Sequence, residues 1–276
     1  MNRFTKMKSS DKYVWLDEQR NGRSANRLRA DQGPFFGYET VSEADKAGRV
    51  LKHFDSVAHR YDFMNTLLSF GIHYIWKYTA VRLTDLKPGD RVLDVCGGTG
   101  DLARLASKRV GSSGRVTVYD FNWDMMAAGR PKSARSPHGR RIGYVQGDAE
   151  RIALADNSVD AAMVGFGIRN LTHLEEGFRE MHRVLKPGGK MMCLEFSKPS
   201  APLFRWLYDL YSFHVMPWLG EVLVGTRAAY THLPESIRTF PLPDELSAIL
   251  RGIGFVNVTY RRLTNGIAVI HVGRKG

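Results

Sequence analysis

The sequence predicts an α/β domain built on a mostly parallel sheet that ends in an antiparallel pair of strands. Two observations support this fold class. After the turn at Lys87-Pro88-Gly89-Asp90, short apolar segments alternate with longer segments of mixed polarity, which is typical of buried parallel strands joined by helices. Near the end of the chain, two further apolar segments flank Asn265-Gly266, a dipeptide that favours a tight hairpin turn.

Each element follows from this alternation. Helices are expected near residues 101–109, 122–130 and 173–185, because these stretches are longer and mixed in polarity. Residues 186–189, Lys-Pro-Gly-Gly, are expected to end the last of these helices in a turn. The expected strands are residues 91–95, 115–119, 142–145, 159–165, 190–196, 255–262 and 267–272.

The chain is expected to form one domain, residues 46–276, preceded by a basic and mobile N-terminal arm, residues 1–45. Residues 46–85 look helical and are predicted to act as a lid. An aromatic-rich insertion, residues 199–242, follows the fifth strand. Because ligands bind at the carboxyl ends of parallel strands, this insertion is expected on the substrate side.

Composition and charge exclude several classes of protein. A length of 276 residues with 43% hydrophobic residues allows a large core, which excludes a disordered, collagen-like or disulfide-stapled chain. The net charge of +12 suggests an anionic partner. Cys96 and Cys193 lie in apolar segments, which indicates a reducing compartment. We expect neither a transmembrane helix nor a signal peptide, and the early acids Asp11, Asp17 and Glu18 argue against a transit peptide.

A glycine-rich loop follows the first expected strand and leads into a helix. Glycines let the backbone approach a ligand closely, and the helix N-terminus supplies free N–H groups. By itself the loop is ambiguous, because Gly98-x-Gly100-x-x-Ala103 followed by Asp120 also fits a dinucleotide site. The candidate cofactor-binding residues of the loop are Gly97, Gly98, Thr99 and Gly100.

Acids at the ends of three successive strands favour S-adenosylmethionine. Asp94 stands at the mouth of the loop, where a carboxylate suits the ammonium group of this molecule better than it suits a pyrophosphate. Asp120 ends the second strand and can accept both ribose hydroxyls. After the third strand, Asp148 can bind the adenine amino group and Ala149 can supply a backbone N–H. S-adenosylmethionine is therefore the expected cofactor, with a dehydrogenase site as the alternative.

Two longer motifs resemble those of a known family. Residues 61–76, Tyr-Asp-Phe-Met-Asn-Thr-Leu-Leu-Ser-Phe-Gly-Ile-His-Tyr-Ile-Trp, and residues 183–197, Arg-Val-Leu-Lys-Pro-Gly-Gly-Lys-Met-Met-Cys-Leu-Glu-Phe-Ser, are similar to the signatures of the ubiquinone/menaquinone biosynthesis C-methyltransferases. The resemblance implies a seven-stranded, Rossmann-like class I methyltransferase sheet, with cofactor contacts at Thr99, Asp120, Asp148 and Ala149. One departure is Gly165, where relatives often have a serine.

The resemblance also implies a reaction, methyl transfer to a ring carbon of a reduced polyprenyl quinone precursor. That precursor is a demethylmenaquinol, a 2-polyprenyl-6-methoxy-1,4-benzoquinol, or both. A ring carbon becomes nucleophilic when the neighbouring phenol loses its proton. Arg169 is expected to stabilise the phenolate or to orient a water that takes the proton, with Asn170 assisting, because arginine is not itself a base. His73 is a candidate base, and the expected lid residues are Tyr61, Asp62, Asn65 and Trp76.

The expected partners are a polyprenyl quinol and an anionic membrane surface, contacted by the aromatic residues of 203–219. The predicted location is the cytoplasm, peripherally on the inner face of the membrane, in preference to the mitochondrial matrix. Nucleic acid is not expected, because the basic segment 130–141 lacks aromatic residues for base stacking. No His or Cys spacing fits a metal site. Another small-molecule or RNA methyltransferase, a noncatalytic subunit working with other quinone-biosynthesis enzymes, and a homo-oligomer stay open.

Overall fold

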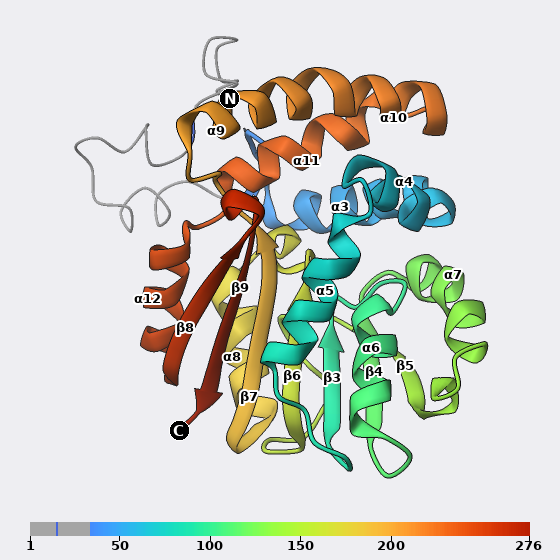
Figure 1. Ribbon diagram of the computed structural model, residues 1–276, viewed down its shortest axis with the longest axis vertical. Coiled ribbons are helices and arrows are strands. Elements are labelled where there is room, and N and C mark those ends of the chain that lie inside the picture. The colour runs from blue at the N-terminus through green and yellow to red at the C-terminus, as the bar shows by residue number, and fades with distance from the viewer. Residues whose placement is uncertain (1–14, 16–33) are drawn as a thin grey trace.

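The core of the protein is a seven-stranded sheet with the strand order β5-β4-β3-β6-β7-β9-β8. The computed structural model describes Trp15 and residues 34–276. All strands run parallel except β9, which is antiparallel to both of its neighbours (Figure 1). The strands are β3 (Arg91–Val95), β4 (Arg115–Asp120), β5 (Ile142–Gln146), β6 (Val159–Gly165), β7 (Leu185–Phe196), β8 (Phe255–Leu263) and β9 (Ala268–Lys275).

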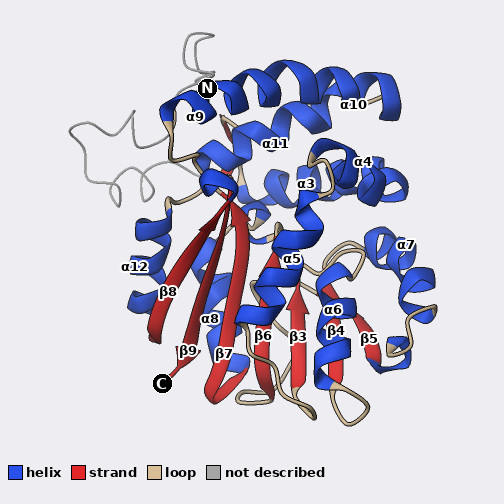
Figure 2. Ribbon diagram, viewed as in Figure 1, coloured by secondary structure: helices blue, strands red, loops and turns tan. Residues whose placement is uncertain are grey.

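Helices cover both faces of this sheet, as Figure 2 shows. One apolar core lies between the sheet and α5 (Ile72–Leu83), α6 (Asp101–Val110) and α7 (Trp123–Ala134). A second core lies on the opposite face, against α8 (Leu174–Val184) and α12 (Pro243–Ile253). Because both faces are buried, the central strands are apolar along their whole length, which confirms the predicted α/β class.

Five helices form a cap above the carboxyl ends of the parallel strands (Figure 1). They come from two distant parts of the sequence, one before β3 and the other between β7 and β8. The cap consists of α3 (Glu43–Val57) and α4 (Tyr61–Leu68) with α9 (Pro202–Leu210), α10 (Met216–Val224) and α11 (Arg227–Thr239), and a π-helical turn, Tyr211–Val215, joins α9 to α10. The insertion after the fifth strand is therefore helical. Among the described residues, no helix combines the length and the apolar character needed to cross a bilayer.

Three boundaries differ from the prediction. The expected arm is too long at its C-terminal end, because β1 (Phe35–Phe36) pairs with β2 (Glu39–Thr40) and the Phe36 ring stacks on His232 of α11 at 3.9 Å. The rest of the arm, residues 1–14 and 16–33, lies outside the described residues. The expected lid includes α5, but this helix packs against α6 and β7 as part of the sheet layer. The expected turn at 186–189 is a bulge inside β7, where the pairing register with β6 shifts.

The C-terminal hairpin forms as predicted. Asn265 and Gly266 both adopt positive φ angles, 56° and 89°, which a glycine and an asparagine tolerate better than other residues. The hairpin adds β8 and β9 to the edge of the parallel sheet, so that Thr264 and Ile267 come to lie beside the cap.

Candidate functional site

Two adjoining cavities lie between the sheet and the cap. The first, of about 190 Å³, is lined by the loops that follow β3, β4 and β5. The second, of about 330 Å³, is lined mainly by apolar and aromatic side chains of the cap. Four residues line both cavities and therefore form the wall where they meet: Phe54, Tyr61, Lys77 and Phe166.

Gly97, Gly98 and Thr99 of the glycine loop line the first cavity, whereas Gly100, also expected at the site, does not. Gly98 and Gly100 adopt positive φ angles of 51° and 75°, so a side chain at either position would be strained. A Cβ at Gly97 would lie 2.9 Å from the Asp94 carboxyl carbon. The Gly98 N–H donates to Asp120 Oδ2 at 2.8 Å, which ties the loop to the end of β4.

Asp94 is a buried acid with one unused oxygen. Its Oδ2 accepts the Ala103 N–H at 2.9 Å, whereas Oδ1 is buried without a hydrogen-bond partner among the described residues. Burial raises the pKa of Asp94 to about 7, and the nearby acids Asp120 and Asp101 add to this shift. An unpaired carboxylate oxygen in this position fits a cationic ligand group, such as the ammonium group of S-adenosylmethionine.

The other two strand-end acids lie in the same cavity. Burial raises the pKa of Asp120 to about 6, although its oxygens accept the N–H groups of Gly98 and Asn122. Asp148 and Ala149 line the far part of the cavity, after β5. The structure thus brings all the residues predicted to hold the cofactor, except Gly100, to one cavity.

The second cavity contains a buried guanidinium. Arg169 follows β6, and its Nη1 donates to both oxygens of Glu195 at 3.0 and 3.2 Å and to the Phe166 carbonyl. Its Nε donates to Ser236 Oγ at 3.4 Å, and Nη2 has no partner among the described residues. Burial raises the pKa of Glu195, and the Arg169 charge opposes this shift. Arg169 is therefore held in place by one edge while another N–H pair stays available to a ligand.

The remaining predicted residues divide between the two cavities. Asn65, His73 and Trp76 line the second cavity, and Asn170 lines the first, with Nδ2 buried and unpartnered among the described residues. Asp62 lines neither. Its Oδ1 accepts the Thr99 hydroxyl at 2.8 Å and its Oδ2 pairs with Lys132, so it ties α4 to the glycine loop.

Comparison with known proteins places this site in a family. The sequence pattern of the ubiE/COQ5 methyltransferase family matches residues 40–275. The chain belongs to the ubiE/COQ5 methyltransferase family. It is therefore a methyltransferase, and its methyl donor is S-adenosylmethionine, which excludes the dehydrogenase alternative.

Relatives at the sequence level cover nearly the whole family domain. A ubiquinone/menaquinone biosynthesis C-methyltransferase of Pseudomonas paraeruginosa is 44% identical over 251 residues, which are 90% of this chain and 98% of that relative. A protein of the same name from Edwardsiella ictaluri is 44% identical over 248 residues, 89% of this chain and 99% of that relative.

Solved structures support the fold. A possible histamine N-methyltransferase of Thermotoga maritima, described as S-adenosylmethionine-dependent, aligns with a TM-score of 0.59 at 19% identity, covering 82% of this chain and 99% of its own. The cyclase SpnF aligns with the same TM-score at 17% identity, covering 82% of this chain and 94% of its own. Both confirm the predicted seven-stranded methyltransferase fold.

Gly165, where the resemblance implies a serine, lies close to Leu102 of α6. Gly165 lines the first cavity, and a Cβ there would lie 2.6 Å from Leu102 Cδ1. A serine at this position would therefore require the Leu102 side chain to move. Among Trp15 and residues 34–276, no group of three or more His, Cys, Asp or Glu side chains is arranged to hold a metal ion.

Sequence reasoning missed two polar residues of the site. Lys77 lines both cavities and pairs with Asp101 at 2.5 Å, although it is almost fully buried. His53 lines the second cavity, and burial lowers its pKa to about 4, with the Arg169 charge contributing. The position of Lys77 one helical turn after His73 was a usable signal, because both then share one face of a helix. No such signal marked His53.

Proposed function

We propose that this protein transfers the methyl group of S-adenosylmethionine to a ring carbon of a reduced polyprenyl quinone precursor in ubiquinone or menaquinone biosynthesis. The names of its relatives, at 42–44% identity, support this substrate class. The observation that carries the proposal is the wall shared by the two cavities, because a methyl donor in the first would face an aromatic ring in the second across Tyr61 and Phe166.

The residues of the two cavities have distinct tasks in this reaction. When bound, S-adenosylmethionine supplies an electrophilic methyl group on a positively charged sulfur. Arg169 Nη2 donates to the quinol oxygen next to the reacting carbon, so that negative charge can build up on that oxygen once its proton has passed to a water molecule. The ring carbon that gains the methyl group then releases its hydrogen as a proton to water. Asn170, which lines the first cavity, assists Arg169 in stabilising this charge. The aromatic walls of the second cavity hold the ring in reach of the methyl group and exclude water, so positioning contributes much of the rate.

A direct assay tests this proposal. The full chain is incubated with S-adenosylmethionine and a reduced quinol that lacks the ring methyl group, and the lipid is analysed by mass spectrometry. A product that has gained one methyl group on the ring is expected. Demethyl quinones should also accumulate in a strain without the gene, and the accumulated species names the natural substrate. Methylation of RNA but not of the quinol would instead support the RNA methyltransferase alternative.

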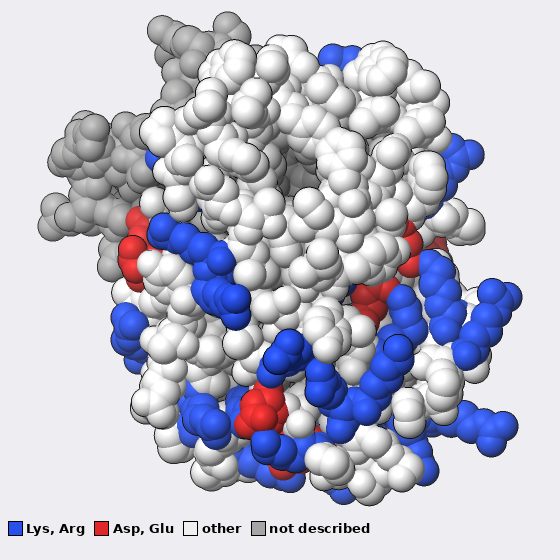
Figure 3. Space-filling view, in the orientation of Figure 1, with Lys and Arg blue, Asp and Glu red and all other residues white. Residues whose placement is uncertain are grey.

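We also propose that the cap docks on an anionic membrane surface, where a polyprenyl substrate resides. Large apolar side chains of α9, α10 and the α4–α5 turn are exposed, among them Phe70 (79%), Trp206 (61%) and Trp218 (56%). Figure 3 shows the upper part of the molecule hollowed and largely free of charge, with lysines and arginines gathered below it. A groove beside Tyr74 is lined by four basic residues that reach the surface, Arg104, Lys108, Lys132 and Arg135. Apolar contact flanked by cations suits an anionic bilayer.

Liposome co-sedimentation tests the docking surface. Binding should increase with the fraction of anionic lipid and decrease with salt. Trp206→Ser and Trp218→Ser should weaken it, whereas the matched control Val256→Ser, an exposed residue of β8 outside the cap, should not. A chain that ignores anionic liposomes at low ionic strength would contradict the docking proposal and leave the methyltransferase reaction untouched.

A further inference from the structure

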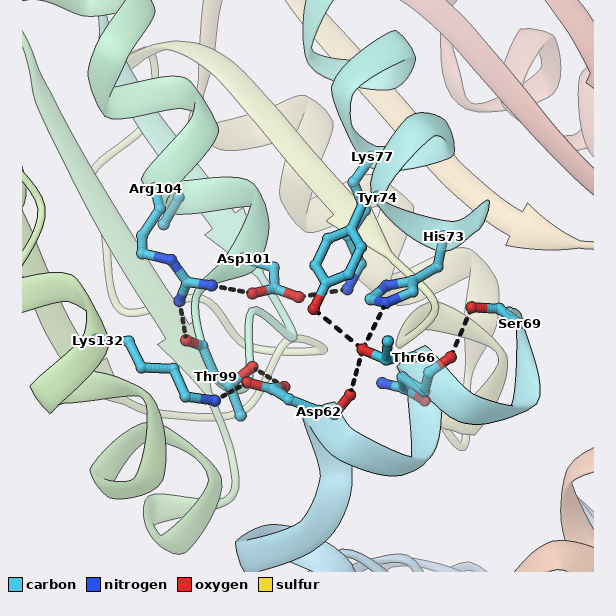
Figure 4. Close-up of polar contacts among 12 residues, drawn as sticks. Asp62, Thr66, Ser69, His73, Tyr74, Lys77, Thr99, Asp101, Arg104 and Lys132 are labelled. Carbon is cyan, nitrogen blue, oxygen red and sulfur yellow. Dashed lines mark hydrogen bonds and ion pairs between the residues drawn. The ribbon is translucent and has the colours of Figure 1, made fainter. Parts of the chain in front are cut away.

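The second cavity contains a histidine with one unused ring nitrogen. His73 of α5 lines this cavity and is buried. Its Nε2 lies 3.3 Å from Thr66 Oγ1 on α4, and Figure 4 shows the ring directed toward this hydroxyl. Its Nδ1 is buried without a hydrogen-bond partner among the described residues.

The hydrogen bonds of Thr66 fix which nitrogen of His73 carries the proton. The Thr66 hydroxyl has a single hydrogen, which it donates to the Asp62 carbonyl at 2.8 Å. Thr66 Oγ1 must therefore accept from its other two neighbours, His73 Nε2 at 3.3 Å and the Tyr74 hydroxyl at 3.0 Å. The proton of the neutral ring thus sits on Nε2, and Nδ1 is a bare lone pair.

The surroundings of His73 keep this lone pair unprotonated at neutral pH. Burial lowers the pKa of His73 to about 4, and the charge of Lys77 contributes to the shift, whereas Asp101 and Asp62 oppose it. A buried acceptor without a partner is unfavourable. Nδ1 is therefore suited to a ligand that brings a hydrogen-bond donor into the cavity.

A second polar group of the cavity, Arg169, can donate a hydrogen bond but cannot accept one. Arg169 presents Nη2, which can only donate, and it reaches the cavity from the loop after β6 rather than from α5. The cavity thus offers a donor held by Glu195 and an acceptor held by Thr66 on a wall that is mainly aliphatic and aromatic. A 1,4-quinol carries the two complementary groups, because one of its oxygens can accept a hydrogen bond while the other hydroxyl donates one.

We propose that His73 makes this cavity selective for the reduced ring, because Nδ1 accepts a hydrogen bond from a ring hydroxyl that the oxidised dione lacks. The inference rests on the proposed function, which makes an aromatic diol the substrate. A bound dione would place a carbonyl lone pair against the lone pair of Nδ1 and leave a buried acceptor unpaired. Sites built around a substrate hydroxyl discriminate strongly against analogues that lack it.

Binding measurements with one compound in two redox states test this inference. The probe is a 1,4-naphthoquinone with a single isoprenoid unit, used as the dione and, after reduction with dithionite, as the diol. Both are titrated anaerobically into the full chain with S-adenosylhomocysteine present, so that no methyl group is transferred. The diol is expected to bind at least about tenfold more tightly than the dione.

Variants separate hydrogen bonding from packing. His73→Phe should bring the ratio of the two affinities close to one. Thr66→Val should do the same with His73 in place, because the ring can then carry its proton on Nδ1, whereas Thr66→Ser should keep the wild-type ratio. His271→Phe is the matched control, since His271 also has a buried Nδ1 without a hydrogen-bond partner among the described residues but lines neither cavity. Its ratio should stay as in the wild type.

The outcomes distinguish this inference from the proposed function. Equal binding of diol and dione by a wild-type chain that methylates the diol would overturn the inference alone. An unchanged ratio in both His73→Phe and Thr66→Val would overturn it as well. A wild-type chain that neither binds nor methylates the diol would overturn the proposed function together with it.

Discussion

The first cavity, which contains the expected cofactor-binding acids, is the cofactor cavity, and the second, which contains Arg169, is the quinol cavity. The two are encoded in the sequence in different ways. The polar residues expected to bind the cofactor come from loops that directly follow β3, β4 and β5, so each is encoded beside the strand that positions it, whereas α3 and the loop after β6 complete the walls of this cavity. The quinol cavity is lined by residues of α3–α5, the loop after β6, α9–α11 and the C-terminal hairpin. The first of these residues in the chain is His53 and the last is Ile267.

The two cavities also differ in chemistry. Buried acids with raised pKa values, Asp94 and Asp120, define the cofactor cavity. Aromatic side chains, one guanidinium and two neutral histidines define the other. The polar methyl donor is bound through charged and hydrogen-bonding groups, whereas a prenylated ring is bound mainly through apolar contacts. Substitutions in one cavity should therefore leave ligand binding in the other largely intact.

The largest loss of activity is expected from substitutions in the quinol cavity. Arg169→Met combined with Glu195→Gln removes the guanidinium together with its buried counter-charge, and kcat should fall about 10²–10³-fold because a donor to the developing charge is lost. The dissociation constant of S-adenosylmethionine, measured by calorimetry, should change little. Arg169→Met alone would leave Glu195 charged and unpaired, which costs about 3–5 kcal/mol of stability.

A matched ion pair provides the control. Arg179→Met with Glu175→Gln removes an Arg–Glu pair at 3.0 Å that is half exposed on α8 and lies outside both cavities. Its kcat should equal that of the wild type. Near-normal turnover in the Arg169 double variant would return that arginine to a purely structural role.

The next effect should come from the cofactor side. Asp120→Asn places an amide N–H₂ against one of two backbone N–H groups, Gly98 or Asn122, and weakens the ribose contacts. Hydrogen bonds to charged groups contribute about 1.5–3 kcal/mol, so S-adenosylmethionine should bind about 10–100-fold more weakly. Calorimetry measures this affinity, and quinol binding should not change. Unchanged affinity for the donor would contradict the assignment of Asp120.

A pH dependence should follow from Asp94. The ammonium group of the donor requires the carboxylate form, and the pKa of Asp94 in the free protein is about 7. Affinity should therefore be full above this pKa and fall about tenfold between about pH 8 and pH 6 as the acid takes up a proton. Burial raises the pKa of Asp101, but the charges of Lys77 and Arg104 lower it to about 2, so Asp101 stays ionised in this range. Asp120, with a pKa of about 6, takes up a proton only at the lower end. Asp94→Asn should bind weakly and show a flat profile between pH 8 and pH 7, above the range in which Asp120 titrates, and a slope there would assign the dependence elsewhere.

The sequence predicts the cofactor side well because its signals are local. Strand ends, glycines and acids stand next to one another, and the parallel sheet brings Asp94, Asp120 and Asp148 to one edge by its topology alone. The predicted strands and helices are confirmed for the same reason. The quinol side was predicted only in part, because its walls meet through tertiary packing.

Three residues illustrate what the sequence could not reveal. The burial of His53 depends partly on α11, where His232 lies 5.2 Å from its ring. In the sequence, Glu195 is part of a strand motif, and only the fold shows that it accepts a hydrogen bond from Arg169. Phe36 falls within the expected arm, but contact with His232 fixes it to the domain. Each depends on a partner more than 25 residues away, which no local pattern encodes.

The smallest effect should come from the contact that joins the two regions. The Thr99 hydroxyl donates to Asp62 Oδ1 at 2.8 Å, which connects the glycine loop to α4 of the cap. If this bond couples donor binding to the position of the cap, Asp62→Ala and Thr99→Val should each raise the KM for S-adenosylmethionine about three- to tenfold, since one such bond contributes about 0.5–1.5 kcal/mol. The double variant should be no worse than either single one, because both remove the same bond. Lys132→Ala breaks a half-exposed ion pair with the same Asp62 and should change KM less than about twofold. Steady-state kinetics on the four variants measure this coupling, and strictly additive losses would mean that the cap and the cofactor loop act independently.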